Sequence, residues 1–74
     1  MRLDVRGAAS AELPLRMLNL LAQHGVTLER FSVERSGDDY ELSVEACSVP
    51  GARAELILEK IRSMVLVAGA DMTA

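Results

Sequence analysis

Hydrophobic positions along the chain follow two different periods, and the order of these periods outlines a fold. Leu3 and Val5 alternate with charged neighbours near the N-terminus, which is typical of a half-buried strand. An apolar stripe at helical spacing follows. The period then returns to two on both sides of a polar turn, before a second helical stripe and a last apolar run. We expect strands at residues 2–6, 27–35, 40–48 and 65–69, helices at about 14–24 and 52–63, and a short tail at 70–74.

The order strand, helix, strand, strand, helix, strand predicts an α+β protein of the ferredoxin-like βαββαβ plan. Such a protein has an antiparallel four-stranded sheet with two helices on one face. A length of 74 residues favours a single domain spanning 1–74. Strict alternation fails between Leu28 and Phe31, so we expect a bulge near Glu29 and Arg30. Gly25 accepts the left-handed conformation that ends the first helix.

Composition and charge restrict the classes of partner. A domain of this size buries only about 60% of its unfolded surface, yet the chain is 50% hydrophobic. We therefore expect a partner to cover part of the apolar surface. A net charge of −3 argues against a nucleic-acid partner, because binding phosphate requires a basic face. No apolar run approaches the roughly 20 residues of a membrane span and no signal peptide is evident, so we expect no membrane association and a cytoplasmic location.

The residues with reactive side chains are few and isolated. His24 is the single histidine, and at the last turn of the first helix we expect a capping role. Cys47 is the single cysteine, so an internal disulfide and a Cys-x-x-Cys metal clip are excluded; we interpret it as an inert, buried or interface residue. Glu34, Glu41 and Glu45 could be taken for paired carboxylates, but one face of an antiparallel sheet is commonly solvated. The sequence predicts no catalytic residue, no metal and no cofactor.

The junction between the first strand and the first helix is the one place where a small ligand is expected. Amide groups at a helix N-terminus point outward and could hold a carboxylate. Ser10 is the predicted N-cap, with Glu12 favourable near the positive end of the helix. The junction contains no Gly-rich phosphate motif, and Gly7 to Ser10 includes no cation, so an acylphosphatase-type enzyme is disfavoured.

Three stretches resemble an ACT domain. Residues 13–28, LPLRMLNLLAQHGVTL, resemble its first helix and second strand, with a leucine-rich helix, a polar pair, a glycine and a strand. The helix ELILEKI at 55–61 and the run MVLV at 64–67 continue the resemblance over nearly the whole chain. Within that family the chain is most similar to the short small (regulatory) subunit of acetohydroxyacid synthase, also called acetolactate synthase.

The resemblance implies a regulatory role. ACT domains pair edge to edge or back to back and bind amino acids at the interface. The small subunits of the synthase dimerise and activate a large thiamine-diphosphate enzyme of branched-chain amino acid biosynthesis, and some transmit inhibition by valine. The expected function is thus a non-catalytic regulatory subunit with two partners, a second copy and the large subunit. The alternative is a free-standing amino-acid sensor that regulates another enzyme. The effector site carried over by resemblance comprises Ser10, Ala11, Glu12 and Leu13, with Val26, Thr27 and Leu28 opposite.

Two positions depart from the pattern of ligand-binding family members. Glu12 stands where they usually have glycine, and Thr27 where they usually have asparagine. A glutamate would place negative charge where an amino-acid carboxylate docks, and Pro14 removes one amide donor of the first turn. The alternative is that Glu12 only stabilises the start of the helix. We predict weak or absent amino-acid binding.

Overall fold

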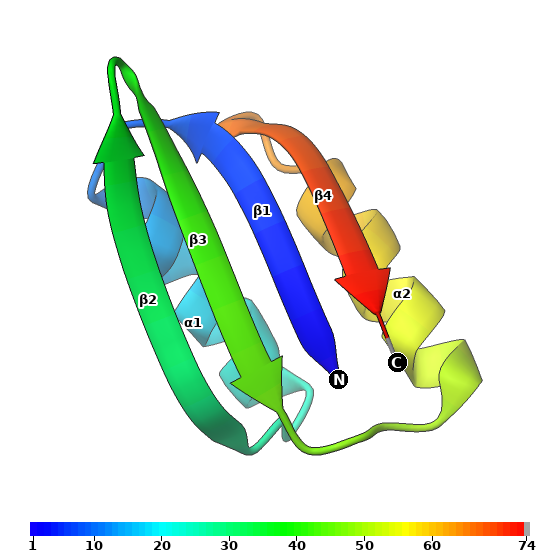
Figure 1. Cartoon of the computed structure of the whole chain (residues 1–74). Helices are drawn as coiled ribbons and strands as arrows, with labels where there is room; N and C mark the ends of the chain where they lie inside the picture. The colour runs from blue at the N-terminus through cyan, green and yellow to red at the C-terminus, as the bar shows by residue number, and fades with distance from the viewer. Residues whose placement is uncertain (74) are drawn as a thin grey trace.

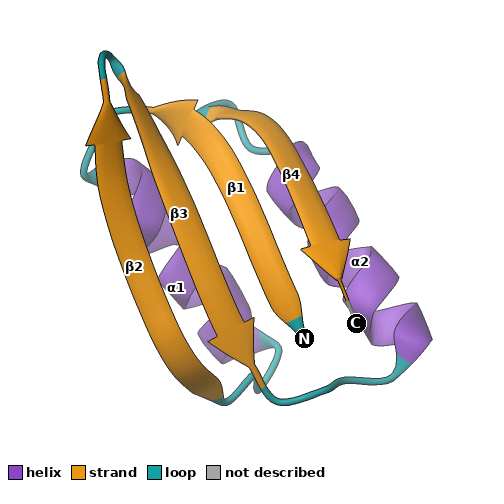
Figure 2. Cartoon of the chain, viewed as in Figure 1, coloured by secondary structure: helices purple, strands orange, loops and turns teal. Residues whose placement is uncertain are grey.

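The computed structural model describes residues 1–73, which form one antiparallel sheet and two helices (Figures 1 and 2). The four strands have the order β2-β3-β1-β4, and both helices lie on the same face of the sheet. The predicted α+β class and βαββαβ order are therefore confirmed. The elements are β1 (Arg2–Ala8), α1 (Glu12–Gln23), β2 (Leu28–Ser36), β3 (Asp39–Ala46), α2 (Gly51–Arg62) and β4 (Val67–Thr73).

The core lies between the helices and the two central strands. Leu3 of β1 lies opposite Val44 of β3, and Val5 lies opposite Leu42, with all four side chains buried. Alternate residues of a strand point to opposite faces, so the neighbours of these four lie on the open face. The helices supply the other half of the core from the fully buried residues Leu13, Met17, Leu21, Ile57 and Ile61.

The β2–β3 hairpin is built as the alternation predicts. Ser36 pairs with Asp39 across a two-residue loop, and Gly37 takes a φ of 61°, as the first loop residue of a type II′ turn does. The register shifts between Leu28 and Arg30, which confirms the predicted bulge. From Arg30 to the turn the pairing is regular.

The first helix ends at the position predicted from Gly25, but it begins earlier than predicted from Pro14. Gly25 has a φ of 67° and donates to the Ala22 carbonyl, while Val26 donates to the Leu21 carbonyl, which together form a Schellman motif. At the other end the helix begins at Glu12, so the expected start near Pro14 is wrong. Proline is tolerated there because it is the third helical residue, where its missing amide hydrogen would have no partner within the helix.

The expected last strand is present, but its expected bounds of 65–69 are wrong, because β4 spans Val67–Thr73. Met64 to Leu66 instead form a turn that connects α2 to the sheet, and Val65 is 96% exposed. Most of the expected tail is therefore strand, with Ala70 paired to Val5 and buried; position 74 lies outside the described residues. β4 packs beneath α2, and Ala70 is its buried residue.

The other boundaries differ by one or two residues from those expected. β1 continues to Ala8, β3 ends at Ala46 and α2 begins at Gly51. Pro50 precedes α2 in the cap position with an extended backbone conformation, and the helix begins immediately after it.

Candidate functional site

The junction of β1 and α1 is held against the turn that follows α2. The Ala8 amide donates to the Leu66 carbonyl over 2.9 Å. Gly7 permits this contact, because a Cβ at that position would collide with the Leu66 carbonyl oxygen and lie 2.8 Å from Leu13 Cδ2. The shape of the junction therefore depends on a residue without a side chain.

The amide groups of the junction are largely occupied within the chain. Ala9 donates to the Asp38 carbonyl, and Ser10 to the Ala8 carbonyl. Leu13 donates to the Ser10 carbonyl over 3.0 Å, and the Glu12 amide donates to the Ser10 hydroxyl over 3.3 Å. With Ala8 already paired, five of the six amides from 8 to 13 have partners, and only that of Ala11 lacks one among residues 1–73. An amino-acid carboxylate would find few free donors here.

The helix cap differs slightly from its prediction. Ala11 directly precedes the assigned helix, but it already has helical dihedral angles and makes no side-chain capping bond. Ser10 nevertheless uses its hydroxyl as a capping residue does, accepting the hydrogen of an amide at the start of the helix.

The side chain of Glu12 is exposed and forms an ion pair with Arg16, one helical turn later, over 3.4 Å. Both residues line a hollow of about 240 Å³, together with Leu13 and the turn 64–66. Sequence reasoning missed this hollow because it assigned the turn residues to a strand. The exposed side chain of Val65 indicates that these residues form a turn, and this exposure is known only from the structure.

The two halves of the predicted effector site lie at opposite ends of α1. Ser10, Ala11, Glu12 and Leu13 are at its N-terminus, whereas residues 26–28 follow its C-terminus. A 12-residue helix is about 18 Å long, so the halves do not meet within one chain. Only two copies of the chain could bring them together.

The residues after α1 have mainly structural contacts. Val26 and Leu28 are half-buried and pack against the core. Thr27 is exposed, and its carbonyl accepts a hydrogen bond from the Cys47 amide over 3.1 Å. Among residues 26–28 of a single copy, Thr27 is therefore the residue whose side chain a ligand could contact.

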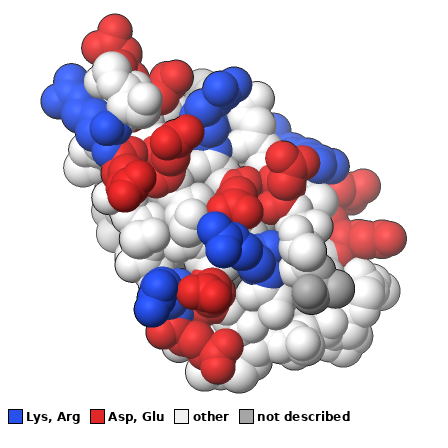
Figure 3. Space-filling view, viewed as in Figure 1, with Lys and Arg blue, Asp and Glu red and all other residues white. Residues whose placement is uncertain are grey.

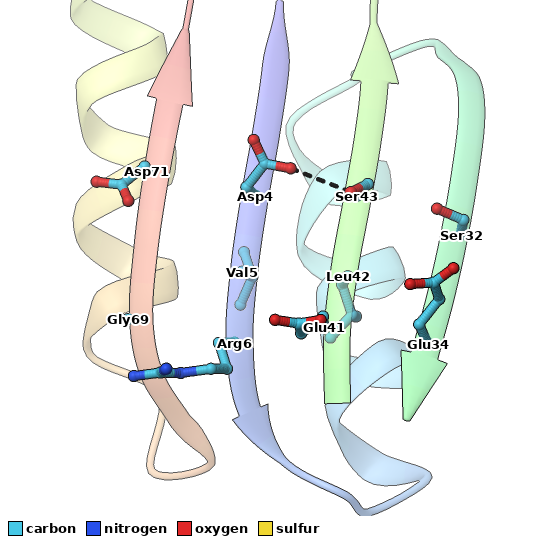
Figure 4. A pocket seen from close by; sticks show the side chains of 10 residues that line it. All are labelled: Asp4, Val5, Arg6, Ser32, Glu34, Glu41, Leu42, Ser43, Gly69 and Asp71. Carbon is cyan, nitrogen blue, oxygen red and sulfur yellow. Dashed lines mark hydrogen bonds between the residues drawn. The ribbon is translucent and has the colours of Figure 1, made fainter. Parts of the chain in front are cut away.

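The open face of the sheet carries acidic and basic side chains in close mixture (Figure 3). It contains a shallow hollow, shown in Figure 4, in which the Ser43 hydroxyl donates to Asp4 over 3.0 Å. Glu34 lies directly opposite Glu41 in this hollow, and Arg6 extends over the neighbouring strand. The carboxylates of Glu34 and Glu41 are exposed, as is typical of the solvated face of an antiparallel sheet.

The two remaining reactive side chains, His24 and Cys47, lie at the ends of α1 and β3. His24 occupies the C-cap position of α1, and its Nε2 lies 3.4 Å from the Lys60 ammonium nitrogen. Cys47 is exposed directly after β3, so the buried alternative is wrong, and an interface position stays a prediction. Within residues 1–73 no three His, Cys, Asp or Glu side chains are grouped as metal ligands, and no helix is long and apolar enough to cross a membrane.

Comparison with known proteins agrees with this geometry. A family model described as ACT-like domain matches residues 1–74. The chain belongs to the ACT-like domain family, and it is accordingly a regulatory domain of non-catalytic type. No curated protein is significantly similar to it in sequence.

Solved structures show the same fold at low sequence identity. The ACT domain of GTP pyrophosphokinase from Chlorobium tepidum superposes with a TM-score of 0.81 at 6% identity, covering 95% of this chain and 91% of that one. The C-terminal domain of MgtC from Mycobacterium tuberculosis gives 0.78 at 15% identity, over 95% and 80%. A homoserine dehydrogenase from Thiobacillus denitrificans gives 0.80 at 14% identity, over 96% of this chain but 16% of that one.

Proposed function

We propose that this chain is a non-catalytic regulatory subunit that forms a homodimer and binds the large catalytic subunit of acetohydroxyacid synthase. In this role it activates an enzyme of branched-chain amino acid biosynthesis and itself binds amino acids weakly or not at all. Support for this enzyme comes from the resemblance of residues 13–28, 55–61 and 64–67 to the short small subunit. The model of the ACT-like domain family matches residues 1–74, and this match agrees with a small subunit of that kind.

The observation that favours an assembly role over a sensing role is the hydrogen bonding of the β1–α1 junction. Its amides are mostly paired within the chain, and Glu12 adds a carboxylate beside them. A ligand carboxylate would have to displace these bonds and approach a like charge. The Glu12–Arg16 ion pair is exposed and reduces this repulsion only slightly.

The proposal is tested by reconstitution. The purified large subunit from the same organism is assayed for acetolactate formation alone and with increasing amounts of this chain. We expect activity to rise to a plateau at a fixed ratio of the subunits, and the two chains to elute together in size-exclusion chromatography. Unchanged activity and separate elution would remove the synthase from the proposal.

The alternative function is a free-standing amino-acid sensor, and the hollow beside Glu12 is the observation that favours it. Its volume of about 240 Å³ exceeds the roughly 150 Å³ cavity that accommodates benzene in another protein, so a small aliphatic amino acid would fit. Calorimetry against the twenty amino acids separates the two functions. A saturable heat with micromolar affinity would favour the sensor.

The substitution Glu12→Gly tests the charge argument. Glycine removes the negative charge from the N-terminus of α1, so any amino-acid affinity should rise, by about twofold to fivefold for removal of one like charge at the surface. The control is Glu55→Gly, which removes the same charge from the second turn of α2, away from the predicted effector site. Equal affinities of the Glu12 variant and the parent chain would contradict the argument.

A further inference from the structure

The face of the sheet that points away from the helices is polar throughout. Because alternate residues of a strand point to opposite faces, the neighbours of the buried core residues lie on this face. They are the even-numbered residues of β1 and, from Arg30 on, of β2, together with the odd-numbered residues of β3 and, from Gly69 on, of β4. None of these residues, called the open face below, has a large apolar side chain.

The whole net charge of the chain is located on the open face (Figure 3). The open face has three arginines, Arg2, Arg6 and Arg30, and therefore three positive charges. Its six carboxylates are those of Asp4, Glu34, Asp39, Glu41, Glu45 and Asp71, which gives a net charge of −3. The rest of the chain has five basic and five acidic residues and is neutral.

The carboxylates of the open face are neutralised to different degrees. Arg2 and Arg30 each form an ion pair with a carboxylate of the same face, over 3.3 and 3.5 Å. Glu34, by contrast, lies directly opposite Glu41, and neither forms an ion pair with another residue of 1–73. Like charges directly opposite each other destabilise an antiparallel pair. The excess negative charge is therefore greatest near Glu34 and Glu41, where external cations would relieve the repulsion.

A second pair of like charges lies across the sheet, where Asp4 of β1 is opposite Asp71 of β4. The small residues Ser43 and Gly69 line a hollow between the two pairs (Figure 4). Within residues 1–73 no three His, Cys, Asp or Glu side chains are grouped as metal ligands, so the carboxylates do not converge on one ion. Their spacing instead suits several separate cationic side chains on the surface of another protein.

We propose that the open face binds a basic surface of the large catalytic subunit, whose Arg and Lys side chains meet the carboxylates beside the hollow. The inference rests on the regulatory-subunit function proposed above and names the surface of this chain that makes the contact. Charge complementarity supports this occupant, because a net charge of −3 on one face steers and orients a positively charged partner. Exposed ion pairs contribute little each, so the face affects the rate of association more than the final affinity.

A second copy of the chain is a poor occupant of the open face. Two open faces brought together would oppose −3 with −3. The core of a protein interface is depleted in charged residues and enriched in aromatic ones, and the open face has no large apolar side chain that would compensate for the repulsion.

Binding kinetics with the purified large subunit from the same organism test the charge complementarity. The large subunit is immobilised, and surface plasmon resonance follows association of this chain at about 50 and about 300 mM NaCl. We expect the association rate constant to fall by about threefold or more over this range, because salt screens exposed charges. An association rate constant that salt leaves unchanged would overturn the proposal.

Neutralising carboxylates should weaken the complex. Glu41→Gln should raise the dissociation constant at the lower salt concentration by about twofold to fivefold, as expected for one exposed ion pair. Combined with Glu34→Gln, it should raise the dissociation constant by about fivefold or more. The matched control is Glu59→Gln, which removes the same charge from an exposed position of α2 and should change the dissociation constant by less than about twofold.

Arg6 provides a test of opposite sign. Its side chain forms no ion pair among residues 1–73, and it lies on the open face opposite Glu41. Arg6→Gln removes a charge that repels a basic partner, so the dissociation constant should fall by about twofold to fivefold. The control is Arg53→Gln on α2, for which we expect less than a twofold change. Weaker binding by Arg6→Gln would contradict a basic partner.

Urea unfolding of the free chain separates loss of contact from loss of fold. Glu41→Gln removes one member of the pair of like charges, so the midpoint of unfolding should rise, by up to about 1 M urea, while the complex weakens. A variant that bound less because it was unfolded would show a lower midpoint. A lower midpoint would therefore overturn the repulsion on which the inference depends.

The outcomes distinguish this inference from the function on which it rests. A large subunit that does not bind the chain at either salt concentration would overturn both. Binding that the Glu41, Glu34 and Arg6 variants leave unchanged would preserve the regulatory function and remove the open face as the contact. Self-association that increases when the carboxylates are neutralised would assign the face to a second copy and overturn the inference. Weaker binding by Glu41→Gln, tighter binding by Arg6→Gln and unchanged binding by both α2 controls would support it.

Discussion

Gly7 lies where β1 approaches the turn after α2 most closely, and replacing it with alanine tests how tightly this junction is packed. The added Cβ would collide with the Leu66 carbonyl oxygen, a backbone atom, and would lie 2.8 Å from Leu13 Cδ2. The same carbonyl accepts the Ala8 amide hydrogen over 2.9 Å. Relieving the collision therefore requires the turn to move away from β1 and this hydrogen bond to lengthen.

The size of the effect follows from these two contacts. Overpacking of this kind costs about 1–3 kcal/mol, and loss of the hydrogen bond adds about 0.5–1.5 kcal/mol. We expect Gly7→Ala to lower the free energy of unfolding by about 1.5–4.5 kcal/mol. A single core of this size supplies only about 3–5 kcal/mol, so the variant should lose a large part of its stability.

Urea unfolding followed by circular dichroism, at one fixed protein concentration, measures the change. With a denaturant slope of about 1 kcal/mol per molar urea, the midpoint should fall by about 1.5 M or more. The matched control is Gly69→Ala in β4, where a Cβ meets nothing within 4 Å and φ is not positive. We expect this control to lie within about 0.5 kcal/mol of the parent chain. Equal stability of the two variants would refute the packing argument.

Two further substitutions test the core and the β4 edge of the sheet, where Arg62 donates to the Ala70 carbonyl. Leu21→Ala removes a fully buried side chain of α1 and should lower the free energy of unfolding, measured by thermal unfolding, by about 2–5 kcal/mol. The control Leu15→Ala, at an exposed position of the same helix, should lower it by less than about 0.5 kcal/mol. Similar losses in both variants would contradict the assignment of the buried face. Arg62→Met removes both donors to the Ala70 carbonyl and exposes the β4 edge, so sedimentation should detect species larger than a dimer. An unchanged distribution of species would show that Arg62 does not protect this edge.

The pattern of residues was sufficient to predict the elements whose signals are local. Leu42 and Val44 alternate with polar neighbours because one face of β3 is buried, and this period is visible without any coordinates. Gly25 ends α1 through its own conformational freedom. The bulge near Arg30 was predictable for the same reason, since one extra residue interrupts the alternation.

The position of β4 was not predictable from local pattern. The run 64–67 has the apolar composition of a strand, yet most of it forms the turn after α2. The strand itself includes Gly69 and Ala70, which are weak strand formers. Pairing with β1 and packing beneath α2 determine this strand, and both are contacts between residues distant in sequence.

The same distinction applies to the candidate site. The sequence placed a junction of Ser10, Ala11, Glu12 and Leu13 at the start of a helix and showed the unusual charge of Glu12. Only the tertiary structure showed that the junction amides are hydrogen-bonded within the chain and that residues 26–28 lie a helix length away. It also showed that Arg62 donates to the Ala70 carbonyl at the β4 edge of the sheet, whereas β2 forms the opposite edge. A local pattern reports which face of an element is apolar. Which donor meets which acceptor depends on the three-dimensional packing of all the elements together.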